Sequence, residues 1–343
     1  MSGVGSGSVD LGTGHPGDHP GTGRLALGID AGGSSTRWLL VDEAGEHRGA
    51  GRVGPVSAID LPHDPSAELV AGSDDPTIAN LEALAKAVLA AGAPSFVLAG
   101  VTGLDTLSPE AVRLEGFLAN LLAVPVQSVR VLGDIATAYL ASFAPGMGVL
   151  VYAGTGSVAV HIATDGSLVR AGGHGYLIDD GGGGFWIGRE ALRRVLRIAD
   201  ESGGPAGGVL AAAIYADMGG SDWPTIRRIV YGGGRSRVAA LTPIVARAAS
   251  RGDQDALAVL AGAGAELARL AGIVCGRLGQ VLPVALAGGV AQCGAPLLKA
   301  LAASVPAGAS VSVATTSPVE AAAAVARQLA AGEAALPAKW LPS

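Results

Sequence analysis

The chain has 343 residues, which is long for one hydrophobic core and favours two domains. Its net charge is −6 and its Lys and Arg residues form no dense run, so neither nucleic acid nor an anionic membrane is expected as a partner. The two cysteines suit a reducing cytoplasm better than a disulfide framework, and neither a secretory signal nor a membrane-spanning apolar run is expected.

Residues 1–23 are rich in Gly, Ser and Pro and can bury almost no apolar surface, which predicts a disordered leader. The residue patterns then predict strands at 24–29, 37–42 and 45–52, a helix at 78–91, a strand at 96–101, a helix at 109–122, a strand at 128–132 and a helix at 135–143. The run Ala144-Pro-Gly-Met-Gly148 ends this half, because it breaks helices and strands alike.

The same order begins again after that break. The predicted elements are strands at 149–152, 157–162 and 168–172, helices at 184–198, 207–215, 225–231, 241–251 and 256–278, a strand at 284–287, a helix at 295–303, a strand at 310–313 and a helix at 319–331. This repeat indicates an α/β fold with a mixed sheet flanked by helices in each half and a cleft between the halves. We expect domains at 24–145 and 146–343, and the last helix could pack back on the first domain.

The most informative motif is Gly28-Ile-Asp-Ala-Gly-Gly-Ser-Ser-Thr36, which lies between two predicted strands. A P-loop would need a Lys after its glycines and a dinucleotide fingerprint would need a helix, so the motif is neither. A Gly/Ser/Thr hairpin instead presents backbone N–H groups and hydroxyls to an anion. Asp30 at its entrance could hold a hydrated Mg²⁺ beside that anion. The candidate phosphate ligands here are Gly32, Gly33, Ser34, Ser35 and Thr36.

A second loop of similar character, Ala153-Gly-Thr-Gly-Ser157, follows the first predicted strand of the second half. Two such loops that face each other would hold a polyphosphate from both sides. The candidate ligands in the second loop are Gly154, Thr155, Gly156 and Ser157.

Asp134 follows an apolar strand and a glycine, which predicts a carboxylate at the C-terminal edge of that strand, on the cleft. Transfer of a γ-phosphoryl group to an alcohol needs a base near the hydroxyl, and Asp134 is the candidate. The alternative is a helix N-cap, since Ile-Ala-Thr-Ala-Tyr follows it. With two phosphate loops present, the base is the favoured interpretation.

Together these motifs resemble the superfamily of sugar kinases, heat-shock chaperones and actin, and within it the N-acetylglucosamine kinases of the BadF/BadG/BcrA/BcrD-type ATPase family. The resemblance covers residues 24 to about 332 and implies two RNase H-like (actin-like ATPase) domains, each with a mixed five-stranded sheet. It also implies ATP and Mg²⁺ as cofactors, and a homodimer. Further segments that carry it are Leu132-Gly-Asp-Ile-Ala-Thr-Ala138, Gly172-Gly-His-Gly-Tyr-Leu-Ile-Asp-Asp-Gly-Gly-Gly-Gly-Phe-Trp-Ile-Gly188, Leu286-Ala-Gly-Gly-Val290 and Ser317-Pro-Val-Glu-Ala321.

The resemblance assigns the sugar site to Asp134 and Asp180, where carboxylate oxygens accept hydrogen bonds from sugar hydroxyls. The alternative for Asp179 and Asp180 is a solvated acidic turn before a helix. His174 and Gly175 are assigned a sugar contact at most, because a lone His is more often structural than catalytic.

The sequence departs from the family pattern at several of these positions. Gly181 and Gly183 replace a Glu and a Ser, His174 stands where relatives commonly have Trp, and Ala58 stands where they often have a sugar-binding Asn. These departures bear on which sugar is bound and not on kinase chemistry.

Gly288 and Gly289 follow a predicted strand and resemble the adenosine loop of the family, where glycines allow a close approach to the backbone. A plain strand-to-helix turn is the alternative.

The resemblance therefore implies an ATP-dependent kinase that phosphorylates the 6-hydroxyl of N-acetylglucosamine, with glucosamine or N-acetylmuramic acid as alternative acceptors. A rival of another class is an ATPase activator of a partner enzyme, since ATPases of the same group bind an iron–sulfur cluster through cysteines. Cys275 and Cys293 lie in apolar segments, which favours buried small hydrophobes instead. A non-catalytic nucleotide sensor would not need Asp134.

Overall fold

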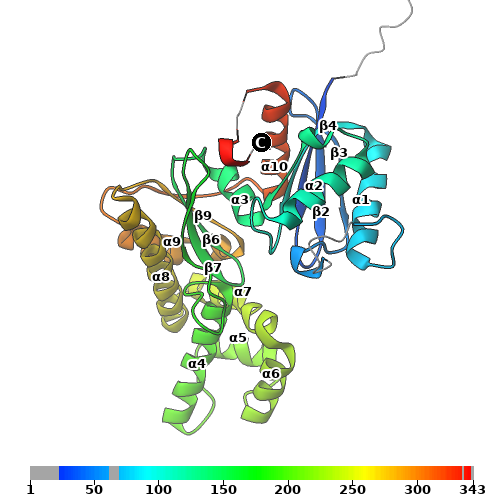
Figure 1. Ribbon diagram of the computed structural model, residues 1–343. Coiled ribbons are helices and arrows are strands. Elements are labelled where there is room, and N and C mark those ends of the chain that lie inside the picture. Colours follow the sequence, from blue (N-terminus) through cyan, green and yellow to red (C-terminus); the bar gives the residue numbers. More distant parts are fainter. Residues whose placement is uncertain (1–22, 62–68, 334–335, 341–343) are drawn as a thin grey trace, which may run out of the picture.

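The computed structural model describes residues 23–61, 69–333 and 336–340. Two α/β bodies lie side by side, each built on one sheet (Figure 1). Except for Gly23, the predicted leader lies outside the described residues.

The first body opens with the antiparallel strands β1 (Leu25–Ala31), β2 (Thr36–Val41) and β3 (His47–Val53). A 3-10 turn, Ala58–Asp60, then precedes α1 (Pro76–Ala91), β4 (Pro94–Val101), α2 (Pro109–Leu122), β5 (Val129–Gly133) and α3 (Asp134–Ser142). β4 joins β1 in parallel and β5 joins β4, which gives the order β3-β2-β1-β4-β5.

The second body repeats this plan with extra helices. Its elements are β6 (Val149–Ala153), β7 (Ser157–Ile162), β8 (Leu168–Gly172), α4 (Gly184–Ser202), α5 (Val209–Met218), α6 (Trp223–Ala239), α7 (Thr242–Ser250), α8 (Gln254–Leu278), β9 (Val284–Ala287), α9 (Ala295–Ser304) and β10 (Val311–Val313). α10 (Pro318–Ala331) follows and packs against the first sheet. The strand order is β10-β9-β6-β7-β8, so the predicted fold class of two mixed five-stranded sheets is confirmed. α4, α5 and α6 extend away from the sheets at the bottom of Figure 1.

Local capping explains where several helices begin. The side chains of Asp75, Ser108 and Asp253 accept hydrogen bonds from backbone N–H groups in the first turns of α1, α2 and α8. Proline follows directly after the first two of these caps, where its missing N–H costs nothing. The start of α2 therefore coincides with the predicted one.

α6 departs furthest from its predicted bounds. The glycine run 232–234 predicts an end at Tyr231, but α6 continues to Ala239 through a kink at Gly234 (φ 57°, ψ −152°). An ion pair between Arg237 and Asp217 fastens the chain beyond the kink.

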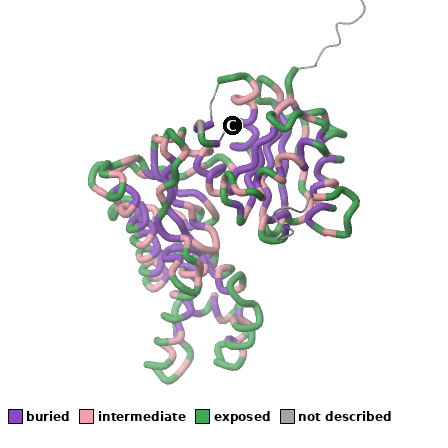
Figure 2. The backbone as a smooth tube through the Cα atoms, in the orientation of Figure 1, coloured by how far each residue is buried: buried purple, intermediate pink, exposed green. Residues whose placement is uncertain are grey.

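Each body has its own core, and a third cluster of buried residues lies between the two sheets. Figure 2 shows the buried strands at the centre of both bodies and mostly exposed or half-buried residues in the helical extension. Side chains alternate along β1, so Leu27 and Ile29 face α1 and α2, whereas Ala26 faces the third cluster. α10 packs on β1 so closely that a Cβ on Gly28 would collide with the Ala323 backbone.

The chain passes between the bodies more than once. It first crosses between α3 and β6, and it returns to the first sheet with α10. Beyond α10, Trp340 is buried and donates an indole hydrogen bond of 3.2 Å to the Gly166 carbonyl in the β7–β8 turn. Lys339 forms an ion pair of 2.6 Å with Asp165 in that same turn.

We expected no apolar run that could span a bilayer. Among the described residues, however, α8 is long enough and apolar enough to do so, judged by length and composition alone, so that expectation is wrong. Half of the apolar stretch is buried, and α8 packs against α4, α7, α9 and the second sheet. This is how a core helix of a globular domain is placed.

Candidate active site

The parallel strands β1, β4 and β5 end at one edge of the first sheet, and polar residues follow two of them. Asp134 is the first residue of α3, directly after β5, and Thr102 follows β4. The Thr102 hydroxyl donates to Asp134 Oδ2 over 2.9 Å, and the Ile135 N–H donates to Oδ1 over 2.8 Å. Gly133 occupies the N-cap position, so the alternative of Asp134 as the N-cap of this helix is wrong.

Asp134 and Asp30 are neighbouring, mostly buried carboxylates. Burial raises the pKa of the Asp134 carboxyl, and its two hydrogen bonds partly offset that rise. Burial likewise raises the pKa of Asp30, while Arg37 lowers it and the Asp134 carboxylate raises it. Oxygen ligands of this kind suit Mg²⁺, and a divalent cation would relieve the repulsion between them, so the donor set fits that ion.

The loop between β6 and β7 is a tight turn seated on the start of α4. The Gly154 N–H donates to the Gly156 carbonyl over 3.0 Å, and the Phe185 N–H donates to the Thr155 carbonyl over 2.9 Å. Within the described part of the chain, no acceptor binds the N–H groups of Thr155 and Gly156. Two backbone donors at this turn are therefore available to an anion.

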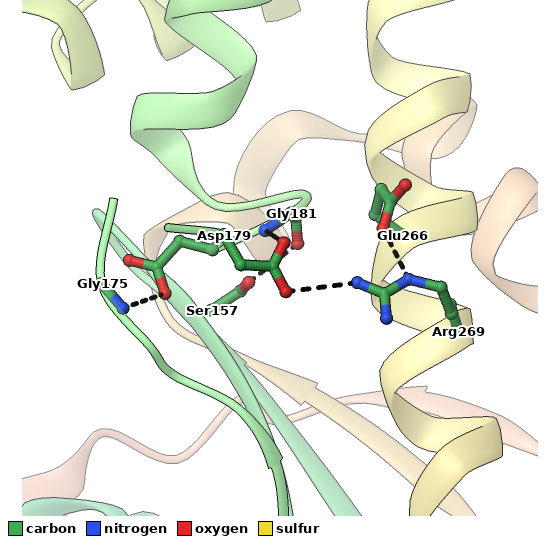
Figure 3. Close-up of polar contacts among 7 residues, drawn as sticks. Ser157, Gly175, Asp179, Gly181, Glu266 and Arg269 are labelled. Atoms are coloured by element: carbon green, nitrogen blue, oxygen red, sulfur yellow. Dashed lines mark hydrogen bonds and ion pairs between the residues drawn. The ribbon is translucent and has the colours of Figure 1, made fainter. Parts of the chain in front are cut away.

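Ser157 belongs to β7, and its buried hydroxyl donates to the Gly181 carbonyl over 2.8 Å (Figure 3). The proton of this hydroxyl already holds the loop that precedes α4, and the expected phosphate contact of Ser157 stays a prediction.

The first hairpin presents Gly33 and Ser34 to solvent, with the Gly32 N–H bonded to the Ser35 carbonyl over 3.2 Å. Thr36 lies within β2, and its side chain is fully buried. Alternation along β2 places the Thr36 side chain on the same face as Trp38, toward α1 and α2, and its expected phosphate contact stays a prediction.

A cleft of about 600 Å³ lies between the bodies. It brings Asp134, Gly154–Ser157, Gly175 and Asp180 together, whereas the first hairpin, Gly288, Gly289 and His174 are not among its lining residues. His174 is exposed, and nothing in the structure supports its expected sugar contact.

The two aspartates before α4 face different ways because Asp180 has a left-handed backbone (φ 59°). Asp180 is buried, accepts the Gly175 N–H over 3.3 Å and lies against Gly156, where a Cβ would collide with its carboxylate. Asp179 turns toward α8 and pairs with Arg269 over 3.4 Å (Figure 3). The alternative of a solvated acidic turn therefore does not hold for Asp180.

One of the two glycines that replace Glu and Ser in this segment is required by its packing. A Cβ on Gly183 would meet the Gly156 backbone at 2.7 Å, whereas one on Gly181 would meet the end of the Glu266 side chain at 2.9 Å. At Gly183 the segment therefore lies closer to the Gly154–Ser157 loop than any larger side chain would permit.

Gly288 and Gly289 follow β9, which is parallel to β6, so both loops leave the same edge of the second sheet. Gly288 has a left-handed backbone (φ 91°), and a Cβ there would lie 2.5 Å from the Ala153 carbonyl oxygen. Gly289 has open space around it, which leaves room for a ligand.

Cys275 and Cys293 are both free and buried, and burial raises the pKa of the Cys293 thiol to about 11. In the described ranges, no group of three or more His, Cys, Asp and Glu residues is arranged to hold a metal ion. Burial among apolar residues is the usual environment of a cysteine that acts as a small hydrophobic side chain.

The fold brings three further residues to this site that no sequence motif marks: Thr102, Tyr152 and Arg235. Tyr152 lines the cleft, and the pKa of its phenol is raised by burial and by the Asp134 and Asp30 carboxylates. Successive side chains of a strand point to opposite faces of the sheet. Val151 and Ala153 face the core of the second body, so Tyr152 between them must face the other way, where the cleft lies.

The profile of the BadF/BadG/BcrA/BcrD ATPase family matches residues 27–325. No curated protein matches the chain. The fold is similar to that of a proposed N-acetylglucosamine kinase from Chromobacterium violaceum, with 24% identity, a TM-score of 0.62, and coverage of 89% of this chain and 99% of the other. The fold is also similar to that of a proposed N-acetylglucosamine kinase from Porphyromonas gingivalis, with 19% identity, a TM-score of 0.64, and coverage of 88% of this chain and 99% of the other. A third similar structure is a ROK family glucokinase from Streptomyces griseus in complex with glucose and AMPPNP. It has 19% identity and a TM-score of 0.53, and the match covers 89% of this chain and 99% of the other.

Proposed function

The chain belongs to the BadF/BadG/BcrA/BcrD ATPase family, and from this and the site geometry we propose that it is an ATP-dependent amino-sugar kinase. Its favoured acceptor is the 6-hydroxyl of N-acetylglucosamine. One observation carries the proposal: a half-buried carboxylate, oriented by Thr102, lines the same cleft as a glycine loop with two unused N–H donors.

Asp134 is the proposed base. Its two hydrogen bonds fix the carboxylate while leaving lone pairs that can accept the proton of the attacking sugar hydroxyl. The raised pKa makes Asp134 a better proton acceptor than an exposed aspartate, provided that it is ionised at the working pH.

The nucleotide would be held at the edges of both sheets. Backbone N–H groups of Thr155 and Gly156 would bind phosphates from the second body, and those of Gly33 and Ser34 from the first. Asp30 would hold Mg²⁺, which neutralises phosphate charge when bound. Gly289 would lie beside the adenosine.

Asp180 and Gly175 would contact the sugar from the second body. The similarity to two proposed N-acetylglucosamine kinases supports an amino sugar as the acceptor. We also expect a cytoplasmic homodimer; the free, buried cysteines are consistent with a reducing compartment, and light scattering on the pure protein tests the dimer.

The decisive experiment incubates the full-length protein with MgATP and one sugar at a time: N-acetylglucosamine, glucosamine, N-acetylmuramic acid, N-acetylmannosamine or glucose. ADP release is measured, and NMR identifies the phosphorylated carbon. We expect the fastest release with N-acetylglucosamine and a 6-phosphate product. Asp134→Asn should slow that release by about 10²-fold or more while still binding ATP. If none of the sugars stimulates ADP release, the proposal is wrong.

A further inference from the structure

Arg235 reaches the cleft through an irregular backbone. It follows Gly234, whose φ of 57° and ψ of −152° are strained for any residue with a Cβ. Arg235 is exposed and lines the cleft together with Gly154–Ser157 and Asp180. The kink therefore directs a cation from the helical extension toward the proposed phosphate loop.

Two aromatic rings in edge-to-face contact support this cation. The Arg235 guanidinium lies over the Tyr176 ring, 5.5 Å from its centroid, and Tyr176 packs edge-on against Phe185 at 4.9 Å. The Phe185 N–H in turn donates to the Thr155 carbonyl over 2.9 Å. Three consecutive contacts thus connect the guanidinium with the loop that offers N–H donors to an anion.

Among the residues that the structure describes, none forms an ion pair with Arg235, although Arg237 on the same helix pairs with Asp217. Arg170 also lines the cleft, but it donates to the carbonyls of Gly172 and Gly173. Arg235 is therefore the cleft arginine whose planar set of N–H donors is still available.

We propose that Arg235 binds the phosphate chain of ATP from the side of the helical extension, beside the Thr155 and Gly156 N–H groups. A guanidinium matches phosphate geometry through paired hydrogen bonds, and a ring beneath it holds it in place. This inference rests on the proposed use of ATP, but not on the identity of the sugar.

The test is calorimetry on the full-length protein with Mg²⁺ and a non-hydrolysable ATP analogue, compared with adenosine. Arg235→Gln should weaken analogue binding by about ten-fold to a hundred-fold, the loss expected for a charge-assisted hydrogen bond, and should leave adenosine binding unchanged. Arg235→Lys should recover part of the loss. Tyr176→Leu should give a smaller loss, because it removes only the support.

Arg227→Gln is the matched control, since Arg227 is exposed on the same helix and is not among the lining residues. It should bind the analogue as the wild type does, and unchanged melting temperatures would show that all variants fold. Wild-type analogue affinity in Arg235→Gln would overturn the inference, as would a loss seen only in the Michaelis constant of the sugar, which would place the guanidinium on an anionic acceptor. The calorimetric readout does not require that any sugar is phosphorylated, so failure of the proposed kinase activity remains a separate result.

Discussion

The Thr102 hydroxyl directs its proton at one oxygen of the Asp134 carboxylate over 2.9 Å, so β4 orients a carboxylate that β5 and α3 supply. This bond lowers the pKa of Asp134 against the rise caused by burial.

Thr102→Val should therefore raise the Asp134 pKa further and leave the carboxylate less well oriented. We expect kcat to fall by about ten-fold and the acid limb of the pH–rate profile to move to higher pH. Thr102→Ser keeps a hydroxyl and should retain the wild-type profile. A profile that does not move in Thr102→Val would show that the bond has no part in the reaction.

Asp134→Asn should make the protein more stable at neutral pH. The pKa of Asp134 is raised in the folded state, so folding favours the protonated side chain. The stability that this side chain contributes is therefore complete at pH values below its pKa in the unfolded chain, about 3.9, and is lost as the pH rises through its pKa in the folded protein. The melting temperature of the variant should exceed that of the wild type at pH 7.5, and the gain should shrink toward pH 4. A lower melting temperature at pH 7.5 would contradict the burial of this charge.

Gly33→Val and Gly154→Val should weaken ATP binding without unfolding the protein. A Cβ on Gly33 has open space, and one on Gly154 has only the Tyr152 ring at 3.6 Å, so the fold tolerates both side chains. Each valine would stand where a phosphate approaches the backbone. Gly204→Val, on an exposed loop with no nearby atoms, is the control. Calorimetry that shows wild-type affinity in Gly154→Val would remove the second loop from the nucleotide site.

Asp180→Ala should raise the Michaelis constant of the sugar by about ten-fold to a hundred-fold, since one carboxylate acceptor contributes roughly 1.5–3 kcal/mol. Its contact with Gly156 adds a smaller loss of ATP affinity. Asp179→Ala is the neighbouring control: it removes a partly exposed ion pair with Arg269 and should cost only about 0–1 kcal/mol of stability. Equal losses for both substrates in Asp180→Ala would assign this carboxylate to the loop or the metal.

Binding should draw the two bodies together. The first hairpin does not line the cleft, although it carries exposed N–H groups, and phosphoryl transfer must exclude water. Small-angle scattering should give a smaller radius of gyration with sugar and a non-hydrolysable ATP analogue together than with either alone. An identical radius in all states would indicate a rigid cleft.

Local signals were sufficient for most of the fold. α2, β7, β8 and β9 begin and end where the sequence predicts, because caps, prolines and turn glycines act within a few residues of the ends they set. The end of α6 was wrong because a glycine run is a local stop signal, whereas the Arg237–Asp217 ion pair that holds the next turn is a tertiary contact.

The site was predictable only in part. The positions of Asp30 and Asp134 could be predicted, because Asp30 lies near the end of one predicted strand and Asp134 directly follows another. The orientation of Thr36 and the partner of Ser157 depend on strand register and on a loop 24 residues away, which sequence patterns do not encode. Thr102 and Arg235 have no motif of their own and reach the cleft through folding alone.

Trp340, a buried tryptophan near the C-terminus, allows the arrangement of the two bodies to be followed by tryptophan fluorescence. Trp340 lies between the β7–β8 turn and the cleft, and only 5% of it is exposed. The Lys339–Asp165 pair beside it is largely exposed and adds little, so burial of the indole holds this segment in place. Among the tryptophans, Trp38 is fixed inside the first body and Trp223 is exposed on the helical extension. A change in tryptophan emission that disappears in Trp340→Phe would therefore report, without any added label, how far the second body has turned from the first.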